Sequence, residues 1–186
     1  MKSVLLHICC GPCAIYPFET LRELGFSVEC FFYNPNIQPE EEYLRRKKAV
    51  EDFYSLFGIK TYFGDYNQEA YLSYRGNVLD KDYRCKSCFR FRLKKTHQFA
   101  LDKGFDFFTT TLLVSPYQNQ QSIKEAGFEL SLDSTTQFLF YDFRDGYRYG
   151  HAKAKELNFY HQKYCGCLLS LEERNQEKRI KQAKIC

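Results

Sequence analysis

Short apolar runs alternate with longer amphipathic segments along most of the chain. Each run is rich in β-branched or aromatic residues and is followed by a Gly, Pro or Asn turn signal, which is typical of buried strands. These runs span residues 3–8, 26–33, 59–63 and 105–114. The segments with helical spacing span residues 14–25, 40–57, about 85–104 and about 119–126. This alternation, without an internal repeat or a linker, predicts one α/β domain over residues 1–186, with three layers and a mostly parallel sheet.

The second half of the chain carries weaker signals. We predict one short helix and a loop over residues 67–82, a short strand over 137–142 and a helical turn over 153–158. Residues 146–150 begin and end with glycine and predict a flexible, basic loop. A strongly charged, basic helix is predicted from about residue 171 to residue 186.

Cysteine content adds chemistry to this picture. The chain has nine cysteines, and most of them fall into three tight groups. The groups are Cys9, Cys10 and Cys13; Cys85 and Cys88; and Cys165 and Cys167. The odd number and the clustering argue against a secreted disulfide framework and favour metal ligation or dithiol chemistry. Cys30 stands alone inside an apolar run and is predicted to be a core residue.

The remaining composition limits the function only loosely. A net charge of +4 permits an anionic partner without requiring one. Fifteen Tyr and 18 Phe, with no Trp, indicate a Phe-rich core edged by Tyr, or a surface that stacks nucleobases. The apolar run after Met1 and Lys2 is too short for a signal peptide, and no run approaches the ~20 residues of a membrane span. We therefore expect a cytoplasmic protein with no membrane partner.

The first cysteine group directly follows the first predicted strand, at the sheet edge where open α/β sheets bind their ligands. Paired with Cys85 and Cys88, the thiols of Cys10 and Cys13 could complete a tetrahedral zinc site. A cubane iron–sulfur cluster takes four thiolates just as readily. Spacing alone does not separate the two, but a closed zinc site leaves the other clustered cysteines unexplained.

The last cysteine group indicates redox chemistry. A disulfide between Cys165 and Cys167 would close a small ring, so it would be strained and easily reduced. A pair of thiols that can form such a bond exchanges two electrons, whereas an iron–sulfur cluster transfers electrons one at a time. The combination suggests a reductive enzyme. A structural zinc ribbon is the alternative. Asp65 also follows a predicted strand, where it acts either as a turn or cap residue or as a metal ligand or acid–base group.

Four short motifs are distributed along nearly the whole chain. They are Leu-His-Ile-Cys-Cys-Gly-Pro-Cys at residues 6–13, Arg-Cys-Lys-Ser-Cys-Phe-Arg-Phe-Arg-Leu at 84–93, Thr-Thr-Thr-Leu-Leu-Val-Ser-Pro at 109–116 and Tyr-Cys-Gly-Cys at 164–167. Together they resemble the QueH family of epoxyqueuosine reductases. The resemblance implies an adenine-nucleotide alpha-hydrolase-like (Rossmann-like) fold. It also implies cobalamin-independent, two-electron deoxygenation of epoxyqueuosine to queuosine at the tRNA wobble position, the last step of queuosine biosynthesis.

The resemblance also implies site residues. It places a [4Fe-4S] cluster on Cys9, Cys10, Cys85 and Cys88, and a redox-active disulfide between Cys165 and Cys167. A second, mononuclear iron is a competing expectation, with Cys13, Cys165, Cys167 and Asp65 as its ligands. The chain departs from the family at residues 160–164, Tyr-His-Gln-Lys-Tyr, where His161 is either a proton donor to the opened epoxide or a packing residue.

The expected partners are tRNA that carries epoxyqueuosine and a separate electron donor. The arginines expected to hold tRNA phosphates are Arg84, Arg90, Arg92 and Arg148. Two other classes stay open. One is a tRNA sulfur-transfer enzyme of the related fold, against which the missing Ser-Gly-Gly-x-Asp-Ser phosphate loop weighs. The other is a zinc- or cluster-stabilised tRNA-binding module without catalysis.

Overall fold

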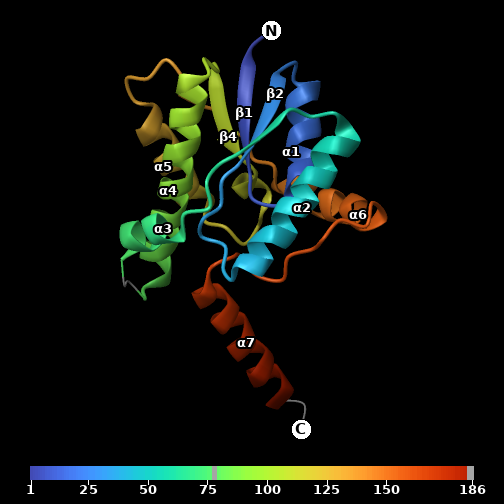
Figure 1. Ribbon diagram of the computed structural model, residues 1–186, viewed down its shortest axis with the longest axis vertical. Coiled ribbons are helices and arrows are strands. Elements are labelled where there is room, and N and C mark those ends of the chain that lie inside the picture. The colour runs from blue at the N-terminus through green and yellow to red at the C-terminus, as the bar shows by residue number, and fades with distance from the viewer. Residues whose placement is uncertain (77–78, 184–186) are drawn as a thin grey trace.

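A computed structural model describes residues 1–76 and 79–183 (Figure 1). Among them, five parallel strands form one sheet in the order β3-β2-β1-β4-β5. The strands are β1 (Ser3–Ile8), β2 (Ser27–Phe32), β3 (Thr61–Phe63), β4 (Phe107–Thr110) and β5 (Gln137–Phe138). The predicted mostly parallel sheet is confirmed. Its strand order reverses between β1 and β4, so the carboxyl ends of these two strands border the crevice where such folds bind ligands.

Helices cover both faces of the sheet, which confirms the predicted three layers (Figure 1). One face carries α1 (Gly11–Glu23), α2 (Glu40–Phe57) and α6 (Tyr147–Glu156). The other carries α3 (Gln68–Arg75), α4 (Lys81–Asp102) and α5 (Gln120–Ser131). Since β1 is buried on both faces, its sequence is a continuous apolar run, interrupted only by the buried His7, rather than an alternating pattern.

The C-terminal helix differs from the others. It is α7 (Leu168–Ala183), which extends from the carboxyl edge of the sheet away from the three layers (Figure 1). It contains no buried residue. The end of the predicted helix, residues 184–186, lies outside the described residues, as do residues 77–78 of the predicted segment 67–82. None of the helices in the described part of the chain combines the length and apolar character that a bilayer crossing requires.

Three local predictions need correction. The predicted loop at 146–150 is a short 3₁₀ turn, η2 (Arg144–Gly146), followed by the start of α6. Gly150 serves helix packing there, because a Cβ at this position would lie 3.1 Å from the Pro12 carbonyl oxygen of α1. The predicted strand 105–114 ends at Thr110, whose hydroxyl caps a 3₁₀ turn, η1 (Thr111–Val114). The predicted strand 137–142 is reduced to the two residues of β5.

The earlier starts of α1 and α4 change the placement of cysteines. Helix α1 begins at Gly11 rather than at residue 14, so Cys13 lies within its first turn. Helix α4 begins at Lys81, capped by the Asp80 carboxylate, which accepts a hydrogen bond from the Tyr83 amide at 2.8 Å. Consequently Cys85 lies one turn inside the helix rather than at its N-terminus.

Candidate active site

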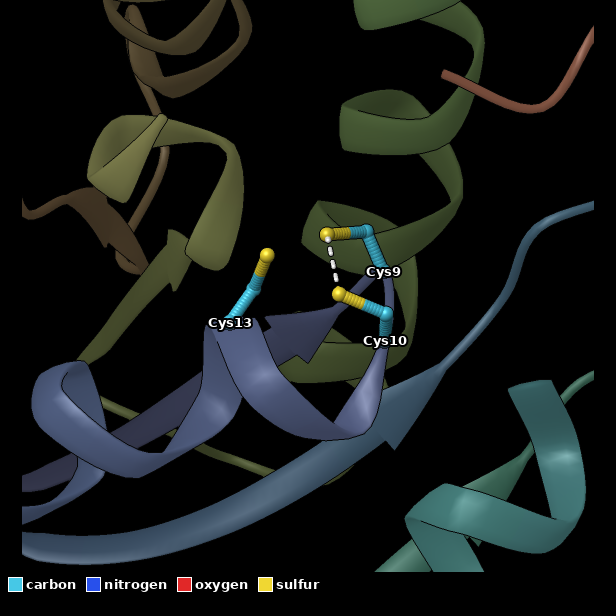
Figure 2. Close-up of side chains that lie close together, drawn as sticks. All are labelled: Cys9, Cys10 and Cys13. Carbon is cyan, nitrogen blue, oxygen red and sulfur yellow. Dashed lines mark hydrogen bonds between the residues drawn. The ribbon is translucent and has the colours of Figure 1, made fainter. Parts of the chain in front are cut away.

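Three thiols meet at the carboxyl end of the central strand β1 (Figure 2). The sulfurs of Cys9, Cys10 and Cys13 all lie within 4.8 Å of one another, and those of Cys9 and Cys10 are 3.8 Å apart. We call these residues the thiol triad. The chain turns directly from strand to helix here, and Gly11 permits this because a Cβ would lie 3.0 Å from the Ala49 carbonyl oxygen of α2. The turn brings adjacent cysteines to the same side, although in a strand they would point apart.

Hydrogen bonds distinguish the three sulfurs. The Thr111 hydroxyl accepts from the Cys9 amide at 3.0 Å and donates to the Cys9 sulfur at 3.2 Å. Hydrogen bonds from Cys10 and Cys13 hold the pKa of Cys9 well below its usual value. Burial raises the pKa of Cys10, and the hydrogen bond to Cys10 raises that of Cys13. Of the three thiols, Cys9 is therefore the one whose environment favours the thiolate.

A cavity of about 450 Å³ opens onto the triad through Cys9 and Cys13. Its wall combines the turn after β1, side chains of α1, α2, α4, η1 and α6, the loop before α7 and α7 itself, and it includes Cys165. Aromatic side chains in the wall come from Tyr117, Tyr147 and Tyr164, and the α7 side chains are Ser170, Glu173, Arg174 and Glu177. The outward-pointing helix is thus part of the site, although it contributes no buried residue.

The segment Cys165-Gly166-Cys167, called here the thiol loop, is held by α2. The buried Arg46 guanidinium donates to the carbonyl oxygens of Tyr164 and Cys165, both at 2.9 Å. Glu42 completes this arrangement with an ion pair to Arg46 at 2.8 Å. Gly166 has a φ of +142°, a conformation that favours glycine. Cys165 is exposed, Cys167 is half-buried and both are free thiols, so the expected disulfide is not present.

The Cys85 and Cys88 pair lies beside the thiol loop rather than within the thiol triad. Burial, followed by the negative charges of Cys165 and Cys88, raises the pKa of Cys85 to about 12. Cys88 is buried against Tyr71. Only the triad, among the described residues, forms a set of three or more metal-ligand atoms within 4.8 Å. The four thiols expected to bind one cluster therefore occupy two neighbouring groups, and Cys13 joins the first.

The four arginines expected to bind phosphate fall into two classes. Arg148 is exposed, and Arg90 is partly exposed and paired with Glu129. Arg84 and Arg92 are instead 5% and 1% exposed, which contradicts a direct phosphate contact at either position. Arg84 pairs with Glu173 of α7. Read as a sequence, the basic run at residues 84–92 resembles a solvent-exposed surface. In the structure its arginines lie on different faces of α4, so some are buried and one is partly exposed.

Asp65 lies outside the thiol triad, and His161 lies beside the cavity-lining His151. Asp65 is exposed beyond β3, and its charge acts on Tyr33 and Tyr43 rather than on a thiol of the triad. His161 is half-buried, and its ring lies 5.4 Å from that of His151. His151, which we did not predict, lines the cavity. Burial, followed by the neighbouring His161, lowers the pKa of His151.

Sequence reasoning missed further site residues. Gln162 donates to the Cys10 sulfur at 2.9 Å, and Asn34 donates to the Ile8 carbonyl oxygen at 2.8 Å. Asn36 is 1% exposed, and neither polar atom of its side chain has a hydrogen-bond partner in the protein. The sequence signal for Gln162 was its place beside the last cysteine motif, and for the asparagines their place after the second strand. Nothing local marked Arg46, which is one of several charged residues on its helix.

A five-stranded parallel sheet with helices on both faces, and with clustered thiols at its carboxyl edge, defines a three-layer α/β protein with a candidate metal site. Comparison with known families is more specific. The model of the family described as "Epoxyqueuosine reductase QueH" matches residues 4–173, and the chain belongs to this family.

Relatives agree with this placement, and two solved structures share the fold. The epoxyqueuosine reductase QueH of Thermotoga maritima is 38% identical over 95% of this chain and 94% of its own. That of Streptococcus pyogenes is 37% identical over 89% of this chain and 69% of its own. The fold resembles a predicted subunit of a tRNA methyltransferase from Methanocaldococcus jannaschii, with a TM-score of 0.54 and 14% identity, covering 84% of this chain and 75% of that one. It also resembles the U34-tRNA thiolase NcsA from Methanococcus maripaludis, solved with its [4Fe-4S] cluster, with a TM-score of 0.55 and 16% identity, covering 96% of this chain and 66% of that one.

Proposed function

We propose that this protein is an epoxyqueuosine reductase acting on the wobble nucleoside of tRNA. The reaction takes up two electrons and two protons, removes the epoxide oxygen as water and leaves the cyclopentene of queuosine. The observation that carries the proposal is the single cavity into which both the thiol triad and Cys165 open, in a chain of the QueH family. The free thiols suit a reducing compartment, so we also propose a cytoplasmic location.

The side chains around the triad fit an iron–sulfur cluster. Thiolates are the ligands that such clusters use. Buried polar atoms without a partner call for an explanation, and a bound group is one. Here they include one terminal nitrogen of Arg92, which lines the cavity, and both amide atoms of Asn36, which lies beside Gly166 of the thiol loop. Amide and guanidinium donors suit an anionic group with sulfur acceptors better than they suit a dry core.

We propose that Cys9, Cys10, Cys85 and Cys88 hold a [4Fe-4S] cluster, with Cys13 as the neighbouring thiol. Such a cluster supplies electrons one at a time. Cys165 and Cys167 then act either as a redox-active pair or, with Cys13, as ligands of a second iron. Because Asp65 is exposed and lies outside the triad, it is the weakest member of that second set.

The remaining cavity side chains would bind and protonate the substrate. Tyr117 is 81% exposed at the cavity wall, where it is available to stack on a nucleobase, and Tyr147 packs edge-on against it. Nε2 of His151 has no partner in the protein, so it is free to hold a proton near the departing oxygen. Lys81, Lys163 and Arg174 at the cavity wall would attract the phosphates of the anticodon loop.

The decisive experiment is mass analysis of tRNA nucleosides after anaerobic incubation with the protein and a reductant. We expect epoxyqueuosine to disappear and queuosine to form. Anaerobically purified protein should be brown, with about four irons per chain. A colourless protein that binds one zinc and leaves epoxyqueuosine unchanged would contradict the proposal and favour a tRNA-binding module. Formation of a thiolated nucleoside would instead identify a sulfur-transfer enzyme.

A further inference from the structure

Arg92 is a fully buried charge in the middle of α4. Its residue is 1% exposed, and it heads the largest fully buried side chains among the described residues. A guanidinium stays protonated in proteins, so burial cannot be relieved by losing the proton. Leaving such a charge buried without a counter-charge strongly destabilises the folded protein. A compensating anion is therefore required.

The protein itself does not supply a carboxylate for Arg92. Its Nε atom donates to the Cys88 carbonyl oxygen at 3.3 Å, and one terminal nitrogen donates to the Asn34 side-chain oxygen at 3.5 Å. Its other terminal nitrogen has no partner in the protein. Within the described residues no carboxylate forms an ion pair with it, whereas Arg46 pairs with Glu42 and Arg84 pairs with Glu173.

Thiol groups take the place of a carboxylate near Arg92. Burial disfavours the charge of Arg92, and the groups that most favour it are Cys88, Cys165 and Cys9, in that order. These three thiols come from three different segments of the chain, and each belongs to a different cysteine group. Arg92 also lines the cavity beside Cys9 and Cys165. Arg92 thus interacts with one thiol from each of the three cysteine groups.

We propose that Arg92 is a positioning residue that provides the fixed counter-charge of the thiol site. Its guanidinium offsets the negative charge of the thiolates and of the group they bind, and so favours the reduced, more anionic state of that group. This inference rests on the proposed function for the presence of a cluster, but it assigns to Arg92 a role that differs from phosphate binding. It also explains why an arginine in a run of surface-like basic residues points inward.

The test is the midpoint potential of the cluster in anaerobically reconstituted, full-length protein, measured by potentiometry with electron paramagnetic resonance. Arg92→Gln removes the charge, Arg92→Lys keeps it, and Lys95→Gln removes an exposed charge from the same helix as a control. We expect Arg92→Gln to lower the equilibrium constant for reduction at least tenfold, which is about 59 mV for a one-electron couple. Arg92→Lys should recover most of the shift, and Lys95→Gln should leave the potential unchanged.

Two results would overturn the proposal. One is a wild-type potential in cluster-loaded Arg92→Gln. The other is an equal shift in Arg92→Lys and Arg92→Gln, which would assign Arg92 a packing role. If circular dichroism shows that the Arg92→Gln variant is folded but the variant holds no cluster, its affinity for Fe²⁺ replaces the midpoint potential as the measured quantity. Recovery of that affinity by lysine then supports the counter-charge, and failure to recover it contradicts the proposal.

The outcomes of the two proposals are separable. If the wild-type protein holds a cluster but does not convert epoxyqueuosine, the proposed function fails while the measurement on Arg92 still stands. If the wild-type protein binds zinc instead of iron, the same variants are compared by their Zn²⁺ affinity. A loss in Arg92→Gln that lysine restores would then support the counter-charge, and wild-type affinity would defeat it.

Discussion

The thiol triad and the thiol loop face the same cavity but are held in different ways. The triad lies within five consecutive residues at the end of a central, fully buried strand, and its position follows from the main-chain turn at Gly11. The thiol loop contains an exposed thiol and depends on side-chain hydrogen bonds from Arg46, a residue 119 positions earlier than Cys165. The first arrangement is preorganised by local backbone, the second by one distant buried cation.

This difference bears on the roles of the two groups. A metal centre needs ligands whose positions are set before the metal arrives, and a buried strand end supplies them. A thiol that exchanges electrons with a substrate or a donor must be reachable, and Cys165 is. The comparison therefore predicts that damage to the triad removes the bound metal, whereas damage to the thiol loop leaves the metal and removes turnover.

The largest effect is expected from Cys10→Ala. The change removes a buried sulfur from the triad, so both iron content and turnover should fall. Loss of a residue that only hydrogen-bonds a metal ligand costs roughly 10–100-fold, and we expect a larger loss here. Metal analysis and nucleoside mass analysis measure the two losses. Cys30→Ala, which removes an equally buried sulfur from β2, is the matched control and should retain both. Retention of iron by Cys10→Ala would show that the triad is not the metal centre.

A smaller, more selective effect is expected from Cys165→Ala. Iron content and tRNA affinity should stay close to wild type, because the exposed thiol lies in the loop rather than in the triad. Turnover should fall by roughly 10³-fold or more, as for loss of a reacting group. Filter binding and single-turnover assays separate the two quantities. Equal loss of affinity and turnover would place Cys165 in substrate binding instead.

Arg46→Met tests whether the thiol loop depends on its distant cation. Removing one partner of a buried pair costs about 3–5 kcal/mol of unfolding free energy, since Glu42 is left buried and unpaired. Glu42→Gln together with Arg46→Met should recover part of this loss. In the folded protein we expect turnover to fall roughly 10–100-fold and alkylation of Cys165 to accelerate. Lys48→Met, which removes an exposed cation from the same helix, should change neither rate.

The smallest effect concerns the opposite end of β1, which takes no part in the site. Hydrogen bonds from Ser3 lower the pKa of Asp106. Because the unfolded chain holds this proton more tightly, the contribution to stability is present at neutral pH and is lost as the pH falls through the carboxylate range. Asp106→Asn should therefore make the melting temperature slightly less dependent on pH between 7 and 3, with unchanged turnover at pH 7. An unchanged pH dependence would contradict the role of Asp106.

Much of the fold was readable from the sequence. The central strand β1 and its neighbour β2 were predicted within one residue because apolar runs closed by glycine, proline or asparagine depend on local chemistry, whereas β4 ends four residues before the predicted strand 105–114 does. The start of α6 was missed because Gly150 signals a loop when read locally. Its reason is the close approach of Pro12 from another helix, which no local pattern reveals.

For the site, too, some features follow from the local sequence and others only from the packing of distant segments. By itself, the sequence determined that three cysteine groups exist, that one follows the first strand, and which family the motifs resemble. Only the tertiary structure decided which sulfurs meet, since this depends on how α2, α4 and the loop before α7 pack around β1. It also decided that Arg92 and Arg84 point inward while Arg148 points out, because burial along a helix is set by its neighbours and not by the charge of the residue. Local chemistry thus determined the set of reactive groups, and long-range packing decided which of them act together.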